Sequence, residues 1–306
     1  YTKMLELDRR MMKKDFSGAR SACNELLNIV RENHSVRRRQ RIGVVYDQLS
    51  RCELYLSHSK RNSNAEEAAN HLQYALSGAR EAQHHFKLNS ENYCIALEQE
   101  FHALFSMGEF DNCIPVVDRM LSSASRKELG EFRYAKYNLL LANVLFKLKR
   151  FDVANNILSE ERQIAQDKYG WEIGARILRI MTLVESNRTD EASIEVRRLK
   201  DFFIYNGKAN SISKRDKKIL NLLLLMERKG FDFSLLVPYL ASTKYVKVNK
   251  IGNYLAELGS VEDGLKWEPF TSEVIPFQEW VLGEMPAGAR NRHLQEKPFS
   301  AQQLRA

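Results

Sequence analysis

Apolar residues recur along this chain with the spacing of α-helices almost throughout. Val44, Leu49, Cys52 and Leu56 make one apolar stripe. A second stripe, between Leu139 and Leu148, is broad enough to be buried on more than one side of its helix. The pattern predicts an all-α protein.

The predicted helices follow one another in pairs. Ser213 and Asp216 fit a capping box, and two acids after Thr189 suit a helix N-terminus, where the dipole favours negative charge. Pro115 is expected in a first helical turn, where its missing N–H costs little. We expect about twelve helices in six hairpins: 2–13 with 16–32, 36–58 with 65–87, 91–107 with 111–123, 126–148 with 152–168, 171–186 with 190–205, and 214–229 with 232–242.

Five short stretches repeat one pattern at the junction of two helices. A helix ends, an aromatic or short polar residue follows, and three residues later comes a small residue. The small residues are Ala19, Ala68, Cys113, Ala154 and Ala192, at intervals of 49, 45, 41 and 38 residues. A recurring period of this size predicts stacked helical hairpins. A small side chain suits the position because two helix backbones approach most closely where they cross.

The composition changes after about residue 245. Four of the six prolines lie there, and beyond a short helix near 248–258 we expect mostly irregular chain. We therefore divide the chain into a repeat domain, 1–245, and a C-terminal extension, 246–306. The extension is too apolar to remain in water, since it carries Trp267, Phe270, Val274, Ile275, Phe277 and Trp280. It is expected to cap the last hairpin or, alternatively, to lie in a groove as a partner peptide would.

The stretches Phe105–Ile114 and Leu145–Ala154 resemble the tetratricopeptide repeat (TPR). In that family a helix ends in Gly-x-Tyr/Phe-Asp-x-Ala, and Gly108, Phe110 and Asp111 match this pattern. The resemblance covers roughly residues 1–242, with spacings longer than the 34-residue consensus. It implies a right-handed superhelix of about six hairpins, in which the first helices line a concave surface that binds peptides.

The resemblance also implies which residues face that surface. By position in the repeat they are His102, Lys136, Asn143, Lys147 and Met181. Some family members clamp a peptide's C-terminal carboxylate with Lys, Asn and Arg. Here Lys136 and Asn143 fit such a clamp, whereas Ile95, Glu98 and Met181 depart from it. A general peptide groove is therefore favoured over a clamp, and ordinary surface polar residues remain an equal alternative.

The net charge of +8 suits an anionic partner, although solubility favours a charge of this size as well. The sharpest basic feature is the run of Arg37, Arg38, Arg39 and Arg41. In a helix that starts near Val36, each charge near the N-terminus costs about 0.3–1 kcal/mol. Nucleic-acid phosphate or an acidic partner would compensate for this cost. A solvated surface run, or a helix that begins earlier, explains the sequence without a ligand.

Signatures of catalysis are missing from the sequence. It contains no G-x-S-x-G, H-E-x-x-H, P-loop or G-x-G-x-x-G motif. The four cysteines, which lack C-x-x-C spacing, are Cys23, Cys52, Cys94 and Cys113. We expect them to be buried core thiols of a protein in a reducing compartment, the cytoplasm, and we expect no metal, no cofactor and no enzyme activity. No segment approaches the ~18 apolar residues of a membrane span. Residues 1–14 lack the apolar core of a signal peptide, although the chain does not begin with Met, which leaves open a leader or an upstream domain.

These observations favour a non-enzymatic scaffold that binds a protein or peptide partner. A nucleic-acid-binding helical repeat that uses Arg37–Arg41 is one alternative. The sensor half of a regulator whose effector domain lies upstream is another. The sequence leaves the partner, the pathway and the oligomeric state open.

Overall fold

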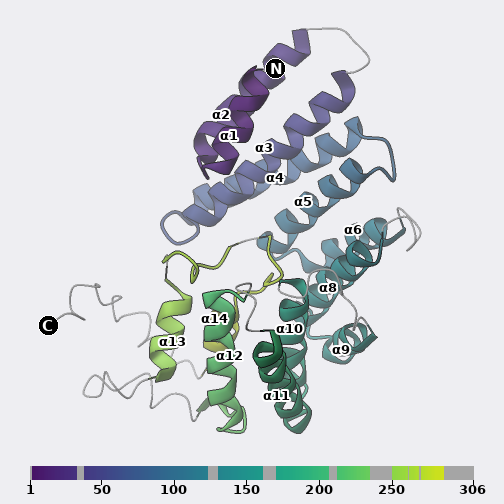
Figure 1. The fold of residues 1–306 in the computed structure, drawn as a ribbon. Helices are drawn as coiled ribbons and strands as arrows, with labels where there is room; N and C mark the ends of the chain where they lie inside the picture. Colours follow the sequence, from purple (N-terminus) through teal and green to yellow (C-terminus); the bar gives the residue numbers. More distant parts are fainter. Residues whose placement is uncertain are drawn as a thin grey trace, which may run out of the picture. The chain divides into compact units, whose positions relative to one another are not determined.

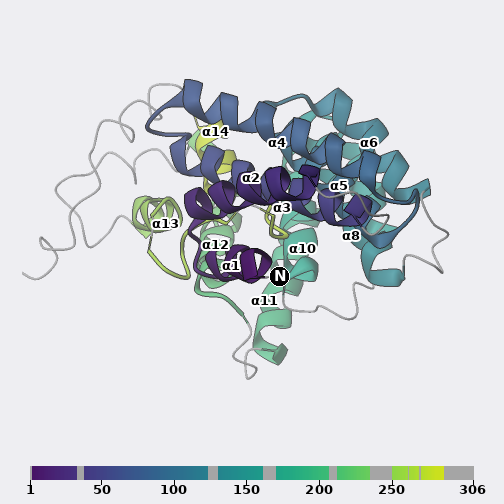
Figure 2. The same cartoon turned by 90° about the horizontal axis from the view of Figure 1, so that it is seen from above.

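The computed structural model describes residues 2–32, 38–122, 130–160, 170–206, 212–234, 250–260, 262–268 and 270–285. Within these ranges the protein is all-α, with thirteen helices that form a TPR-like repeat fold (Figures 1 and 2). The chain divides into two compact units, Tyr1–Lys149 and Arg150–Ala306. The predicted domain boundary near residue 245 lies outside the described residues and stays a prediction.

The first unit contains seven of these helices. They are α1 (Thr2–Met12), α2 (Phe16–Glu32), α3 (Arg38–Lys60), α4 (Ala65–His85), α5 (Glu91–Met107), α6 (Phe110–Ser122) and α8 (Glu131–Lys147). Each packs against the next, and α3 also contacts α5, the first helix of the following hairpin. The first three predicted hairpins are thereby confirmed to within a few residues.

The second unit contains the other six. They are α9 (Phe151–Glu160), α10 (Trp171–Glu185), α11 (Thr189–Asn206), α12 (Lys214–Glu227), α13 (Lys250–Leu258) and α14 (Phe277–Glu284). The helix predicted at 248–258 is confirmed as α13, while most of the helix predicted at 232–242 lies outside the described residues. The capping box at the start of α12 is confirmed, because the Asp216 N–H donates to Ser213 Oγ over 3.0 Å.

Helix α14 was not predicted, because Pro276 reads as a break in irregular chain. In the structure Pro276 stands just before the helix, where its missing N–H is not needed. Its carbonyl accepts bonds from the N–H groups of Glu279 and Trp280. The proline therefore begins a helix instead of interrupting the chain.

Four of the hairpins turn through the same backbone conformation. A left-handed residue lies one or two positions past the first helix in each: Lys14, Gly108, Lys149 and Asn187, with φ between 57° and 80°. In a Schellman motif two backbone bonds then close the helix end. At Gly108, for example, its N–H donates to the Phe105 carbonyl and the next N–H, of Glu109, donates to the Leu104 carbonyl. Only glycine adopts this conformation without a steric penalty, so the other three turns carry local strain.

The five predicted small residues are all buried, and each is the fourth residue of its helix. They are Ala19 in α2, Ala68 in α4, Cys113 in α6, Ala154 in α9 and Ala192 in α11, none more than 6% exposed. The α5–α6 hairpin shows how near the backbone such a residue lies, since Cys113 Sγ is 3.9 Å from the Phe101 carbonyl oxygen. The helices α3 and α4 approach equally closely, because a Cβ added at Gly78 would lie 3.4 Å from the Ser50 nitrogen.

Replacing the left-handed turn residues with glycine should change the free energy of unfolding by different amounts. Lys149→Gly should raise the free energy of unfolding by about 0.5–1 kcal/mol, because it relieves the left-handed strain of a lysine. Asn187→Gly should change it less, since Asn tolerates this conformation. As a control, Lys147→Gly at the last position of α8 should lower it, because glycine is a poorer helix former than lysine. Urea unfolding measures all three, and equal effects of Lys149→Gly and Lys147→Gly would contradict the role given to the turn.

Two adjacent alanines of α4 test the small position. Ala68→Leu should lower the free energy of unfolding by about 1–3 kcal/mol, because the added carbons meet packed neighbours. Ala69→Leu, on the exposed face of the same helix turn, should change it by less than about 0.5 kcal/mol. Equal effects in thermal unfolding would show that the position tolerates bulk.

Candidate functional site

The structure places the five residues predicted to face a groove at different depths. Asn143 is 2% exposed, and its amide donates to the Leu139 carbonyl over 2.8 Å within α8. Met181 is 2% exposed in α10, and His102 is 8% exposed in α5. Lys136 keeps a partly exposed side chain, and Lys147 is exposed. Peptide binding by these five residues stays a prediction. Because three of the five are buried, an accessible site also needs other residues near them.

A polar cluster joins three first helices of the first unit. This first-helix cluster consists of Asp47 and Arg51 on α3, Glu98 and His102 on α5, and Lys136 on α8. The Lys136 ammonium forms an ion pair with Glu98 over 2.6 Å, and the charges of Lys136 and Arg51 both act on His102. The cluster therefore brings together two of the predicted groove residues, His102 and Lys136.

Asp47 is the unusual member of this cluster. Its side chain is 7% exposed, and its Oδ1 oxygen has no hydrogen-bond partner. Burial raises the pKa of Asp47 to about 7, the nearby charge of Arg51 opposes this shift, and that of Glu98 adds to it. Arg51 stands one helical turn further along α3, is exposed, and has no ion-pair partner among the residues that the structure describes.

The other carboxylates buried on these two helices are fully paired. On α3, Glu53 binds Arg20 of α2 over 2.7 Å and His71 of α4 over 2.5 Å. On α5, Glu100 binds Arg80 of α4 over 3.0 Å and Arg119 of α6 over 2.6 Å. Burial alone would raise the pKa of Glu100, but bonds from Gln83 and Arg80 and the charge of Arg119 lower it overall. Each of these acids ties its own hairpin to the one before it, and Asp47 does not.

The histidines near the cluster are uncharged at neutral pH. Burial, followed by the charges of Lys136, His58 and Arg51, lowers the pKa of His102 to about 3. Burial and the charge of Arg61 lower the pKa of His58 to about 4. The basic side chains of the cluster are therefore Arg51 and Lys136, and His102 contributes a neutral polar ring.

Sequence reasoning missed Asp47 and Arg51, although their spacing carries a signal. They are four residues apart on one helix face, as Glu98 and His102 are on the next first helix. A polar stripe on successive first helices would have pointed to this surface. The depth of Asp47 depends on the neighbouring helices, which the spacing does not reveal.

The predicted basic patch is only partly described. Arg37 lies outside the described residues, and α3 begins at Arg38. The Arg39 guanidinium donates to the His84 carbonyl in the last turn of α4 over 2.8 Å, and Arg41 is exposed. A cation near a helix C-terminus is favoured by the dipole, so Arg39 has a structural partner inside the protein.

Other predictions concern thiols, metals and membranes. All four cysteines are free and buried, as expected from the sequence. Among the described residues, no three His, Cys, Asp or Glu side chains gather as a metal site would require. None of the helices in the described part of the chain is both long enough and apolar enough to cross a membrane.

Comparison with solved structures confirms the TPR-like helical repeat fold. A protein from Podosopora anserina described as a kinesin light chain with nearly identical TPR-like repeats matches 68% of this chain and 96% of its own, with a TM-score of 0.52 and 8% identity. The apo form of RapI matches 84% of this chain with a TM-score of 0.58 and 14% identity. That match spans 62% of RapI, less than two thirds of its length. No protein-family model matches the chain, and no curated protein is detectably similar to it.

The raised pKa of Asp47 predicts a pH-dependent effect of its removal. Between the ordinary value of 3.8 and about 7, the unfolded chain has released a proton that the folded chain keeps, so stability falls as the pH rises. The Asp47→Asn variant has no carboxyl group at this position, so it does not lose stability in this way as the pH rises. Its free energy of unfolding relative to wild type should therefore increase by on the order of 2–3 kcal/mol between pH 5 and pH 8.

Urea unfolding at the two pH values measures this difference. His58 and His102 titrate in both proteins, so their contributions cancel in the comparison. Asp118→Asn, at an exposed position of α6, controls for the loss of one negative charge. A difference between Asp47→Asn and wild type that is the same at pH 5 and pH 8 would contradict the assignment.

Proposed function

We propose that this TPR-like repeat protein is a non-enzymatic scaffold that binds a protein or peptide partner through the first-helix cluster of its first unit. The fold is typical of protein-interaction scaffolds. The observation that carries the proposal is Oδ1 of Asp47, a buried acceptor without a hydrogen-bond partner. Such a group costs free energy until a donor reaches it, so a ligand that supplies a donor binds with a gain.

The Asp47–Arg51 pair matches the chemistry of a peptide backbone. A peptide unit offers one N–H donor and one carbonyl acceptor. Ionised Asp47 accepts from the N–H, and the exposed Arg51 donates to the carbonyl. Lys136, already neutralised by Glu98, contributes its aliphatic stem and fixes the adjacent part of the surface. The proposed ligand is therefore an extended segment of a partner protein.

Nucleic-acid binding by the basic run Arg37–Arg41 is less favoured once the contact of Arg39 is taken into account. The Arg39 guanidinium already donates to the His84 carbonyl at the C-terminus of α4. Phosphate binding by this run would need to break that contact. A partner held through its backbone at the first-helix cluster requires no such rearrangement.

Selection of random peptides displayed on phage against the full chain tests the proposal. Enriched peptides should bind the wild type and lose at least about tenfold in affinity for the Asp47→Ala/Arg51→Ala variant, because each lost hydrogen bond to a charged group is worth about 1.5–3 kcal/mol. Glu6→Ala/Arg10→Ala is the matched control, since this pair has the same four-residue spacing on α1. Its affinity should equal that of the wild type.

Two results would refute the proposal. One is a selection that enriches no peptide sequence. The other is equal binding by wild type and by the Asp47→Ala/Arg51→Ala variant, with both proteins shown to be folded by circular dichroism.

A further inference from the structure

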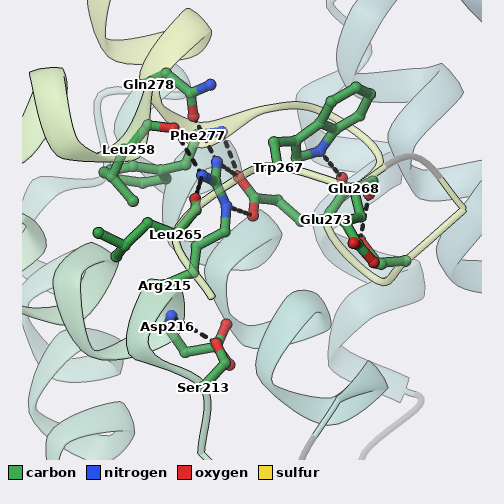
Figure 3. A network of polar contacts seen from close by, with 11 residues as sticks. Ser213, Arg215, Asp216, Leu258, Leu265, Trp267, Glu268, Glu273, Phe277 and Gln278 are labelled. Carbon is green, nitrogen blue, oxygen red and sulfur yellow. Dashed lines mark hydrogen bonds and ion pairs between the residues drawn. The ribbon is translucent and has the colours of Figure 1, made fainter. Parts of the chain in front are cut away.

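The C-terminal segment, residues 262–285, lies against two first helices of the second unit. Figure 3 shows its central contact, the guanidinium of Arg215 on α12, which is 7% exposed. Nε and Nη2 donate to the two carboxylate oxygens of Glu273 over 2.5 and 2.7 Å, and Nη2 also donates to Gln278 Oε1 over 2.6 Å. Nη1 donates to the carbonyls of Leu258 and Leu265 over 2.7 and 2.6 Å. Four of the five N–H donors of one arginine therefore hold this segment, and the fifth binds the end of α13.

A second contact lies one hairpin earlier, on α10. The indole N–H of Trp280 donates to Glu185 Oε1 over 2.6 Å. Ser272 packs directly on Gly174, where an added Cβ would lie 2.5 Å from Ser272 Cβ and 2.6 Å from its carbonyl oxygen. The segment thus spans α10 and α12, the first helices of two successive hairpins.

Helix α13 also covers the last hairpin. Helix α13 packs on α12, with an ion pair of 2.5 Å between Lys218 and Glu257 and the Lys218 ammonium 5.1 Å from the ring centre of Tyr254. A cap needs to cover only the terminal helix. Residues 272–280 pack on the last hairpin as well, since the Trp280 ring centre lies 5.6 Å from that of Phe233. They also reach back to α10 through the Trp280–Glu185 bond and the Ser272–Gly174 contact, as a peptide held on a helical surface would.

We infer that the face formed by α10 and α12 is a peptide-binding surface that holds residues 272–280 of this chain as a built-in ligand. A competing partner must supply the same two groups, a carboxylate for Arg215 and an aromatic N–H for Glu185. In the built-in ligand these are Glu273 and Trp280, seven residues apart. The external partner is therefore an acidic peptide in which a tryptophan follows a Glu or Asp by about seven residues.

This inference stands apart from the proposal for the first unit. It rests on contacts within the second unit, and its variants leave Asp47 and Arg51 untouched. Failure of one test therefore leaves the other intact.

The test uses a fluorescent synthetic peptide of residues 262–285 and the full chain. In the Glu273→Gln/Trp280→Phe variant both anchors of the built-in ligand are lost while its shape is kept. Fluorescence anisotropy should show that this variant binds the peptide at least tenfold more tightly than wild type, whose face is occupied. Adding Arg215→Met to the variant should abolish binding, whereas adding Arg197→Met, at the exposed ion pair with Glu227, should not. A peptide that carries the same two substitutions should bind at least tenfold more weakly than the unmodified peptide.

A second variant separates a ligand from an integral part of the fold. Gly174→Leu adds a side chain that clashes with Ser272. Because leucine is a better helix former than glycine, α10 itself is preserved. In a Trp171→Phe background both remaining tryptophans, Trp267 and Trp280, belong to the segment. Acrylamide should quench their fluorescence more strongly in the Gly174→Leu variant, with the helical circular dichroism signal unchanged.

Two outcomes overturn the inference. In the first, the Glu273→Gln/Trp280→Phe variant is folded but binds the peptide no better than wild type does. In the second, both this variant and Gly174→Leu lose helical signal, which would make the segment a structural cap. Helical signal retained in Gly174→Leu, together with stronger quenching, supports the inference even if the other variant fails to fold.

Discussion

The repeat array depends on how closely two helix backbones approach just after each tight turn. A left-handed residue ends the first helix, and a buried small residue follows it by five positions at each of four turns: Lys14 and Ala19, Gly108 and Cys113, Lys149 and Ala154, Asn187 and Ala192. The left-handed residue sets the direction in which the chain re-enters, and the small residue permits the contact that this direction produces. The unit is the same at these four turns, so the intervals of 41 and 38 residues between Cys113, Ala154 and Ala192 differ only through the helices and connections between one unit and the next.

This local unit explains how much of the fold the sequence could predict. The turn and the small residue lie within six positions of each other, so a reader of the sequence finds them without knowing any distant contact. Helix α14 was missed because its start depends on Glu273, which both accepts the Phe277 N–H and binds Arg215, 58 residues away from it in the chain. The candidate site was missed for a similar reason. Repeat position places His102 and Asn143 on a helix face, but their burial, and that of Asp47, is decided by side chains of neighbouring helices.

Buried charge gives both units a second level of organisation. Glu53 and Glu100 are each paired with one base from the preceding hairpin and one from their own, and Arg215 is paired with the chain's own C-terminal segment. A buried ion is tolerated only where its partners are in place, so these contacts fix which helices can be neighbours more than they add stability. Asp47 does not follow this pattern. Its burial raises its pKa and leaves Oδ1 without a hydrogen-bond partner. A purely structural role requires neither of these.

The two first-helix surfaces therefore differ in what a ligand would gain. At Asp47 a ligand adds a hydrogen bond where none exists, so even a generic peptide backbone improves the free energy, and sequence selectivity must come from neighbouring contacts. At Arg215 every donor is already bonded, so a competitor only exchanges one set of bonds for another. Such an exchange is favourable only for a ligand that reproduces both the carboxylate and the indole. A ligand without the carboxylate leaves the buried Arg215 guanidinium short of its partner, and one without the indole loses the bond to Glu185. The occupied surface is thus the selective one, and the open surface is the permissive one.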